Sequence, residues 1–453
     1  MGVREASAGY EIAMDALCPS GYRQTEVGVI PEDWDVRTIR EVSNVVRGGS
    51  PRPAGDPRYF DGSFIPWLTV AAMTNIPEAR LIVSETASCL TEEGSSLSRT
   101  LTPGTLIIAN SGATLGVAKI LGIKCCANDG IAALPNLSRK ISARYLAHYI
   151  NTQTVHLRNV VATGNGQPNL NTALIGDFHV PIPASLSEQQ AIAEALSDAD
   201  ALIESLQQLI AKKRQIKQGA MQELLTGQRR LSGFGFGAGR KRTDVGVIPE
   251  DWRVVPVGQH LRRAPSYGIN ASAIPFDSRF PTYLRITDIT DDGRFAEATK
   301  VSVSHVASTA YLLELGDIAF ARTGASVGKS YLYRPQDGRL VMAGFLIRLS
   351  PDPDYLIPAF LSFYARSATY WHWVNINSMR SGQPGINGRE YASLPIPLPS
   401  SKSEQEAIIT VLSDMDAEIV GLESRLTKTR ELKQGMMRAL LTGRIRLPLE
   451  AAA

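Results

Sequence analysis

The segment Gly324–Ser330 (GASVGKS) has the residue types of a loop that binds phosphate through its backbone amides. Such a loop needs four residues between its two glycines, but only three separate Gly324 from Gly328, and Thr323 stands where the first glycine would have to be. The corresponding turn in the first half of the chain, Gly112–Ala118 (GATLGVA), has no lysine at the matching position. We therefore interpret both segments as one structural turn that occurs twice.

Other catalytic or metal-binding patterns are also missing from the sequence. The six histidines are scattered without the spacing of metal ligands, and two of the four cysteines, Cys125 and Cys126, are adjacent, which excludes a paired Cys-x-x-Cys site. Neither a Gly-x-Ser-x-Gly elbow nor a Rossmann glycine motif is present. The Asn/Asp-Pro-Pro-aromatic signature of amino-methyltransferases and a correctly spaced PD-(D/E)xK nuclease motif are absent as well. We expect a chain without catalysis, without a metal and without a cofactor.

Composition limits the class of protein further. The chain has 453 residues, and 47 Lys and Arg against 44 Asp and Glu give a net charge of +3, which is too balanced for a polycation. A hydrophobic content of 44% over this length predicts at least two cores. The few cysteines indicate a reducing compartment, and no apolar run is long enough for a membrane span or a secretory signal. We expect a cytoplasmic protein.

The strongest feature of the sequence is an internal repeat. One unit of about 216 residues is written twice, which is far longer than the roughly 20–50 residues of a solenoid repeat, so each copy must be a domain with a connector. The two copies are alike at their edges and share little in their middles, at residues 35–165 and 253–380. The repeated segments are VGVIPEDW (27–34 and 245–252), SEQxAI with LSDxD (187–200 and 403–416), and KQGxM with LLTG (217–227 and 433–443).

Two of these segments predict a pair of long helices. Ser187 with Gln190, and Ser403 with Glu406, have the capping-box pattern of a helix start, and Gly227 and Gly443 supply a helix end. Apolar residues recur along both runs at spacings of three and four, which is typical of a coiled-coil seam, so we expect the two helices to pair in an antiparallel manner. The predicted interface consists of Leu196, Ala199, Ile203, Leu206 and Ile210 on the first helix, and of Leu412, Met415, Ile419, Leu422 and Leu426 on the second.

The middles of the repeats predict mixed α/β domains. Short β-like runs such as Thr105–Ile108 and Asp317–Phe320 alternate with helical segments such as Ala143–Thr152 and Pro358–Ser367. The expected fold is two globular domains joined by two long antiparallel helices, with pseudo-two-fold internal symmetry. The expected boundaries are a tail (1–20), a first domain (21–185), a first helix (186–228), a glycine-rich basic linker (229–242), a second domain (243–400), a second helix (401–447) and a short tail (448–453).

Two dissimilar blocks held by a repeated frame resemble the specificity subunit of type I restriction-modification enzymes. The resemblance extends from about residue 20 to 447 and is carried by the VGVIPEDW, GQPNLN and GQPGIN, VPIP and LPIP, SEQxAI and LLTG segments. It implies that each block is a target-recognition domain that reads one half of a split, asymmetric double-stranded DNA site. It also implies that the helices dock modification (methyltransferase) subunits, and that methylation and cleavage belong to these and to restriction subunits, which bind S-adenosylmethionine, ATP and Mg²⁺.

Candidate DNA contacts follow from the residue types in the loops of each block. Arginine can read guanine through two hydrogen bonds, and asparagine can read adenine. Gln167 and Gln383 occur in both halves, so we assign them to the frame, at the junction between domain and helix. The candidates are Arg47, Arg52, Arg58, Asn110 and Lys119 in the first block, and Tyr267, Asn270, Arg322, Lys329 and Arg380 in the second.

Two other classes of function remain open from the sequence. One is a protein-only scaffold, in which the helices and the blocks bind protein partners. The other is an autonomous nuclease or methyltransferase, which the missing motifs disfavour. Each block is only mildly basic, with 13 Lys and Arg against 10 Asp and Glu in 35–185, and 15 against 11 in 253–400. Much of the phosphate affinity would then come from partner subunits.

Overall fold

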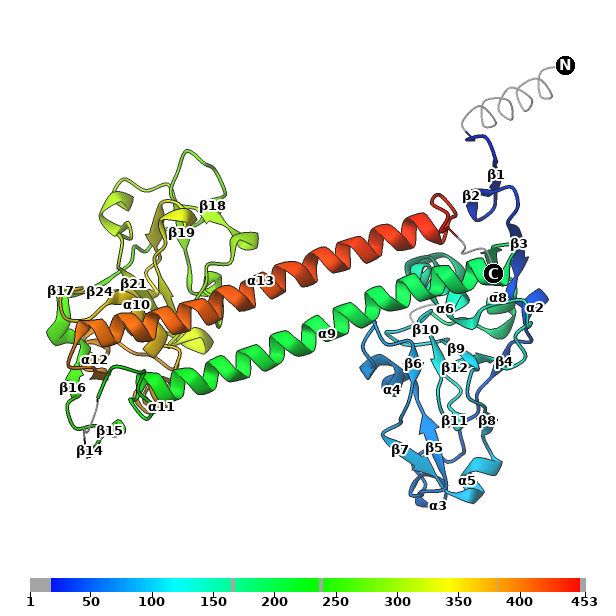
Figure 1. The fold of residues 1–453 in the computed structure, drawn as a ribbon, viewed down its shortest axis with the longest axis horizontal. Coiled ribbons are helices and arrows are strands. Elements are labelled where there is room, and N and C mark those ends of the chain that lie inside the picture. Colours follow the sequence, from blue (N-terminus) through cyan, green and yellow to red (C-terminus); the bar gives the residue numbers. More distant parts are fainter. Residues whose placement is uncertain (1–17, 164–167, 236–238, 381, 449–453) are drawn as a thin grey trace. The chain divides into compact units, whose positions relative to one another are not determined.

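The computed structural model describes residues 18–163, 168–235, 239–380 and 382–448. Nearly all of the predicted N-terminal tail, the end of the C-terminal tail and Gln167 therefore lie outside the described residues. The chain divides into two compact units (Figure 1). Unit 1 comprises residues 1–208 and 423–453, and unit 2 comprises residues 209–422. Each unit thus contains one globular domain and a part of both long helices, instead of one complete repeat.

The domain of unit 1 contains mixed sheets. A five-stranded sheet has the order β4-β12-β9-β10-β6, and a four-stranded sheet has the order β7-β5-β11-β8. Most neighbours are antiparallel, but β6 pairs parallel with β10, and β5 pairs parallel with β11. The elements are β1 Tyr22–Thr25, β2 Gly28–Pro31, β3 Asp35–Thr38, α2 Ile39–Val42, β4 Val46–Arg47, α3 Pro57–Phe60, β5 Ile65–Leu68, α4 Val70–Asn75, β6 Ile82–Val83, β7 Ser88–Leu90, α5 Glu92–Ser96, β8 Arg99–Leu101, β9 Leu106–Ala109, β10 Ala118–Leu121, β11 Cys125–Ala127, β12 Ile131–Leu134, α6 Ala143–Thr152, α7 Thr154–His156, the π-helix η1 Leu157–Val161, α8 Thr172–Gly176 and β13 His179–Ile182.

The domain of unit 2 repeats this plan with a different sequence. Its two four-stranded sheets have the orders β17-β24-β21-β22 and β18-β20-β19-β23. The mixed α/β fold predicted from the sequence is confirmed. The elements are β14 Arg240–Thr243, β15 Gly246–Pro249, β16 Arg253–Pro256, β17 Leu261–Tyr267, β18 Ile274–Pro275, β19 Thr282–Leu284, β20 Val301–Ser302, β21 Ile318–Ala321, β22 Ser330–Leu332, β23 Leu340–Met342, β24 Leu346–Pro351, α10 Pro358–Tyr364, α11 Ala368–Asn377, α12 Gly388–Ala392 and β25 Pro395–Leu398, with 3-10 turns η2 Val257–His260, η3 Ile286–Asp288, η4 Glu297–Thr299, η5 Ser308–Tyr311, η6 Gly324–Ser326 and η7 Pro335–Asp337.

The two predicted long helices are present as α9 (Leu186–Leu225) and α13 (Lys402–Leu440). The predicted capping box is wrong, because each helix begins one residue earlier than Ser187 or Ser403. The capping hydroxyls belong instead to Ser185, which accepts a hydrogen bond from the Glu188 amide at 3.1 Å, and to Ser401, which accepts from the Glu404 amide at 3.3 Å. The predicted helix ends are confirmed, since Gly227 and Gly443 follow the helices with φ near +67° and +68°.

Ion pairs set the antiparallel register of the two helices within each unit. In unit 1, Lys433 lies 2.6 Å from Asp200, and in unit 2 Lys217 pairs with Asp416. These four residues are the last Asp of each LSDxD segment and the Lys of each KQG segment, so the two repeated segments form the same ion pair in both units. Leu196, Ile203, Leu206, Ile210, Leu412 and Ile419 are buried, whereas Ala199, Met415, Leu422 and Leu426 are half-buried.

The end of each long helix packs against a repeated VGVIPEDW segment. A Cβ on Gly443 would lie 2.4 Å from Pro31, and one on Gly227 would lie 2.4 Å from Pro249, so no larger residue fits at either position. Arg230, in the segment predicted as a glycine-rich basic linker, binds Glu404 and Asp251. β14 begins at Arg240, within the last residues of that segment.

A buried histidine gives unit 1 a pH-dependent stability. His148 is 2% exposed, its Nε2 lies 3.3 Å from Ser197 Oγ, and burial lowers its pKa to about 4. The imidazole of His148 therefore stays neutral in the folded protein down to about pH 4, whereas in the unfolded chain it binds a proton near pH 6.5. The free energy of unfolding consequently decreases as the pH falls from about 6.5 to about 4. We expect a loss of about 2 kcal/mol between pH 7.5 and pH 5 from this group. Urea unfolding of His148→Gln should lack this part of the pH dependence, and an unchanged pH slope would contradict the assignment.

Candidate nucleic-acid interface

The two units place different residues at the same point of the same sheet. In unit 1, β12 pairs Ala132 with Arg47 and Ile131 with Ala109. In unit 2, β24 makes the corresponding pairs of Ile347 with Tyr267 and of Leu346 with Ala321. Because the ladders match, Arg47 is equivalent to Tyr267, and the residue that follows each central strand, Asn110 or Arg322, is equivalent too.

Polar side chains gather around Asp129 in unit 1. Arg47 donates from Nε to the Asp129 carbonyl at 2.6 Å, and Ser50 Oγ lies 2.7 Å from Asp129 Oδ1. Arg52 lies 3.6 Å and Arg47 Nη2 3.9 Å from the same carboxylate, and both guanidinium groups are more than half exposed. Asn110 Nδ2 donates to the Asp129 carbonyl at 3.2 Å, while its buried Oδ1 has no hydrogen-bond partner among the described residues. We call Arg47, Ser50, Arg52, Asn110 and Asp129 the unit-1 polar cluster.

The corresponding place in unit 2 has a more aromatic character. The Arg322 guanidinium lies over the Tyr267 ring at 5.1 Å, and its buried Nε has no hydrogen-bond partner in the described part of the chain. The Arg322 amide donates to the Phe345 carbonyl at 3.0 Å, and the Phe345 side chain is exposed. Asn270 lies against Gly344, beside a pocket of about 590 Å³ that it lines together with Phe345. We call Tyr267, Asn270, Arg322 and Phe345 the unit-2 polar cluster.

The repeated GQPNLN and GQPGIN segments hold the central residue of each cluster. The Leu170 amide donates to the Asn110 carbonyl at 2.8 Å, and the Ile386 amide donates to the Arg322 carbonyl at 2.9 Å. Gln383 lies against Gly324 of the paired-glycine turn, so its predicted position at the junction between domain and helix is wrong. A constant segment thus supports a position whose side chain differs between the units.

Four of the predicted DNA contacts lie outside the two clusters. Lys119 is 1% exposed, donates to the carbonyls of Pro77 and Arg80 at 2.9 and 2.7 Å, and has its pKa lowered to about 8 by burial, so it does not face a ligand. Lys329 pairs with Asp291 at 2.7 Å. Arg58 is held by Asp56 and Arg380 by Glu390. Residue type alone made these four residues candidates for DNA contacts. Of the two lysines beside the paired-glycine turns, however, Lys119 points into the domain and Lys329 points to a neighbouring acid.

Sequence reasoning missed Asp129, Ser50 and Phe345. Asn128–Asp129–Gly130 connects β11 to β12, which lie in different sheets, and an Asp-Gly pair between two β-like runs is a recognised turn signal that could have indicated this connection. No sequence signal of comparable strength indicates Phe345.

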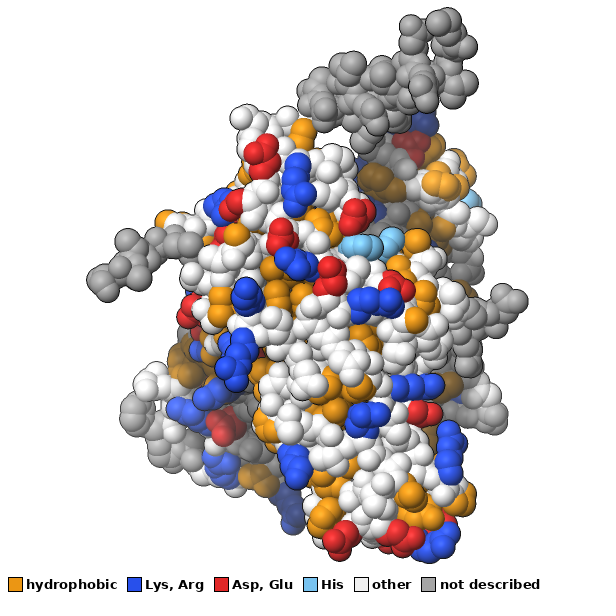
Figure 2. Space-filling view, turned by 90° about the vertical axis from the view of Figure 1, so that its right-hand side faces the viewer, with side chains coloured by type: hydrophobic (Ala, Val, Ile, Leu, Met, Phe, Trp, Pro, Cys, Tyr) orange, Lys and Arg blue, Asp and Glu red, His pale blue; other side chains and the backbone are white. Residues whose placement is uncertain are grey.

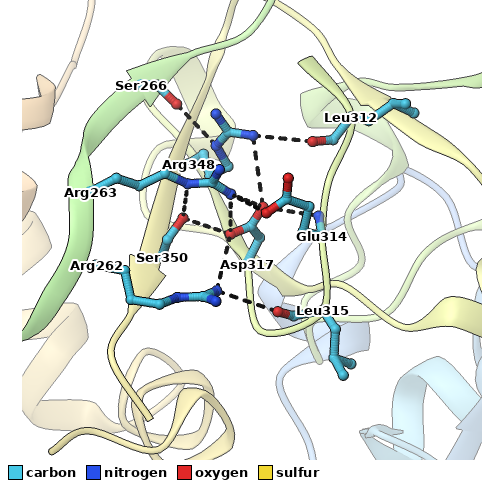
Figure 3. A network of polar contacts seen from close by, with 9 residues as sticks. All are labelled: Arg262, Arg263, Ser266, Leu312, Glu314, Leu315, Asp317, Arg348 and Ser350. Carbon is cyan, nitrogen blue, oxygen red and sulfur yellow. Dashed lines mark hydrogen bonds and ion pairs between the residues drawn. The ribbon is translucent and has the colours of Figure 1, made fainter. Parts of the chain in front are cut away.

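A buried ion network fixes β17, which ends at Tyr267, onto the strands that present Arg322 (Figure 3). Asp317 is fully buried and accepts hydrogen bonds from Arg263 at 2.9 and 2.8 Å and from Ser350 at 2.6 Å. Arg348 lies 3.8 Å from Asp317 and donates to Ser266 on β17 at 3.0 Å. The network therefore holds β17, and with it the backbone of Tyr267, against β24, while the Tyr267 hydroxyl accepts a hydrogen bond from the Gly388 amide at 3.0 Å.

The charged side chains on the face drawn in Figure 2 are of both signs. On the face drawn in Figure 2, Lys and Arg side chains are interspersed with Asp and Glu and do not merge into one basic surface. Among the described residues, no group of His, Cys, Asp and Glu has the arrangement of a metal site. No helix in the described part of the chain is long and apolar enough to cross a membrane.

Comparisons with known proteins agree on one family. The family described as "Type I restriction modification DNA specificity domain" matches residues 31–214 and 282–434. The type I restriction enzyme MjaVIII specificity subunit of Methanocaldococcus jannaschii is 23% identical, over 92% of this chain and 94% of that protein. The EcoKI specificity subunit of Escherichia coli (strain K12) is 24% identical, over 84% of this chain and 82% of that protein. The crystal structure of the S subunit from M. genitalium has the same fold, with a TM-score of 0.57 at 13% identity, covering 90% of this chain and 96% of that one.

The fold and the match together define a non-catalytic DNA-recognition protein with two recognition domains. The chain belongs to the type I restriction-modification specificity-subunit family, because the family matches well over half of its length. The resemblance drawn from the repeated segments is thereby confirmed, and the interpretations as a protein-only scaffold or an autonomous enzyme are not supported.

Proposed function

We propose that the unit-1 and unit-2 polar clusters each read one half of a split, asymmetric site in double-stranded DNA. The single observation that carries the proposal is that equivalent positions of the two sheets bear different side chains, Arg47 and Asn110 against Tyr267 and Arg322, on a frame of repeated residues. Two half-sites of different sequence require this combination, since base readout depends on side-chain identity whereas the frame only positions it.

The chemistry of the clusters supports base readout over general phosphate binding. The exposed Arg47 and Arg52 can each donate two hydrogen bonds to guanine, and the exposed Asn270 can accept one hydrogen bond from adenine N6 and donate one to N7. Asn110 is only 2% exposed, so it holds the Asp129 turn through the Asp129 carbonyl instead of facing a base. Each domain carries only a small excess of positive charge, so little of the affinity comes from phosphate contacts made by this chain alone. Modification subunits that dock on α9 and α13, and restriction subunits in the cleaving assembly, would supply further phosphate contacts. S-adenosylmethionine, ATP and Mg²⁺ would bind those cytoplasmic partners.

Alanine substitutions in the two clusters should each affect recognition of a different half-site. Arg47→Ala is expected to weaken binding to the preferred duplex by about 5- to 150-fold, which corresponds to about 1–3 kcal/mol, and to relax the preference only in the half read by unit 1. Arg322→Ala should do the same only in the other half. The measurement is selection of bound sequences from a duplex library by the full chain assembled with its modification subunits.

Arg37→Ala is the matched control for these variants. Arg37 is an exposed arginine of unit 1 that pairs with Asp35 at 2.9 Å, away from the cluster. It should select the same sequence as the unaltered chain. If Arg47→Ala and Arg322→Ala also select the unaltered sequence, the clusters are not the reading sites.

A further inference from the structure

Asp129 is an acid at the centre of a site that we assign to a polyanion. It occupies the turn between β11 and β12, and its carboxylate is 41% exposed. Acids are unfavourable near phosphates, so a residue of this kind is either a support for its neighbours or a direct discriminator of bases.

The contacts of the Asp129 carboxylate with the two arginines are too long for a fixed support, whereas the 2.6 Å hydrogen bond from Arg47 Nε goes to the Asp129 backbone carbonyl. The carboxylate lies 3.9 Å from Arg47 and 3.6 Å from Arg52, beyond ordinary hydrogen-bond distances. By contrast, Asp56 in the same domain binds Arg58 through hydrogen bonds of 2.7 and 3.2 Å. Asp129 Oδ1 lies at hydrogen-bond distance from Ser50 Oγ, and neither guanidinium lies that close to the carboxylate. Arg47 and Arg52 can therefore leave the carboxylate for another ligand at small cost.

The fold does not require an acid at this position. The equivalent residue of unit 2, by the matching ladders of β12 and β24, is Gly344. A Cβ on Gly344 would lie 1.7 Å from Asn270 Oδ1, so the side chain of Asn270 fills the space that Asp129 fills in unit 1. The acid is thus a property of one recognition domain and not of the repeated frame.

We propose that Asp129 is a specificity-determining residue of unit 1, which accepts a hydrogen bond from a base amino group, as an aspartate does from cytosine N4, and excludes bases that present only acceptors there. This inference rests on the proposed function. An acceptor such as guanine O6 or thymine O4 facing the carboxylate leaves both groups desolvated and unpaired, which penalises the wrong duplex more than it rewards the right one. In the free protein the same carboxylate weakly holds Arg47 and Arg52, and thereby lowers their affinity for arbitrary DNA.

Asp129→Asn tests this inference with little change of shape. An asparagine amide can donate as well as accept, so the variant should tolerate bases that the parent rejects. We expect discrimination at one base pair of the unit-1 half-site to fall about tenfold, with the other half-site unchanged. Binding to unrelated duplex should strengthen, and its log–log salt dependence should steepen by about one unit, because a released arginine can contact a phosphate. Asp129→Glu should restore discrimination in part.

Asp177→Asn is the matched control, since it makes the same charge change in the same unit. Asp177 pairs with Arg40 at 2.6 Å, and the Arg40 side chain is 55% exposed, as is that of Arg47. If Asp177→Asn relaxes the selected sequence as much as Asp129→Asn, the effect is one of net charge and the inference fails. If Arg47→Ala changes the selected sequence but Asp129→Asn does not, the inference fails while the proposed function stands. If none of these variants changes it, the proposed function itself fails.

Discussion

Replacing Asp317 with alanine should destabilise unit 2 by about 3–5 kcal/mol, because Arg348 is then left as an uncompensated charge in a buried site and Arg263 keeps only Glu314 as an acidic partner. Asp317 is fully buried and lies 2.8 Å from Arg263 and 3.8 Å from Arg348, whose side chain is only 11% exposed. The amide of Glu314 also donates to the Asp317 carboxylate at 2.9 Å. Several donors thus lose their common acceptor at once.

The loss should appear in unit 2 and not in unit 1. Urea unfolding of the full chain measures the change in the free energy of unfolding. Hydrogen exchange of peptides from β17, β21 and β24 shows whether the loss of stability lies in unit 2. Asp277→Ala is the matched control, because Asp277 pairs with Arg279 at 2.6 Å at the surface, where such a pair contributes about 0–1 kcal/mol. Equal losses for the two variants would contradict the role given to the buried network. Since β17 carries Tyr267, Asp317→Ala should also impair selection of the unit-2 half-site.

The repeat made the frame predictable from one sequence. The long helices, their glycine ends and the helix Ala143–Thr152 follow from periodicity and local residue types, and the structure has them where they were expected or within a few residues. Repetition reveals which residues matter even without an alignment, since two copies that diverged elsewhere kept them.

What the repeat could not reveal is what each repeated residue contacts. The SEQ segment was interpreted as a capping box, yet Gln189 accepts a hydrogen bond from the Ser142 amide at the start of α6, and Gln405 accepts one from the Ile357 amide at the start of α10. These partners are nearly 50 residues away in sequence, so local patterns carry no information on them.

The candidate site was harder to predict for a different physical reason. Arg47 and Arg52 were found by residue type, but a loop arginine looks the same in sequence whether it faces a neighbouring acid or solvent. Lys119 shows the limit, because its aliphatic stem and hydrogen bonds to two carbonyls make burial possible for a residue that is usually exposed. Asp129 was missed because the candidates were chosen among arginines, asparagines, lysines and a tyrosine only.

The second large loss of stability is expected at the junction between α13 and the VGVIPEDW segment of unit 2. Glu404 is 1% exposed and accepts hydrogen bonds from Arg230 at 2.8 and 2.7 Å and from the indole of Trp252 at 3.2 Å. Glu404→Ala is expected to lose about 3–5 kcal/mol, because Arg230 keeps only Asp251 as a partner and the Trp252 indole is left unpaired in a buried site.

Glu188→Ala removes the equivalent glutamate of unit 1 and should cost less, about 1–3 kcal/mol. Its partner Arg446 is 42% exposed, against 13% for Arg230, and the indole of Trp34 has no hydrogen-bond partner among the residues that the structure describes. Water can therefore compensate Arg446 but not Arg230. Urea unfolding of the two variants side by side measures the difference. A double-mutant cycle should give a coupling between Glu404 and Arg230 larger than that between Glu188 and Arg446. Equal couplings would mean that burial of the arginine does not set the strength of these junctions.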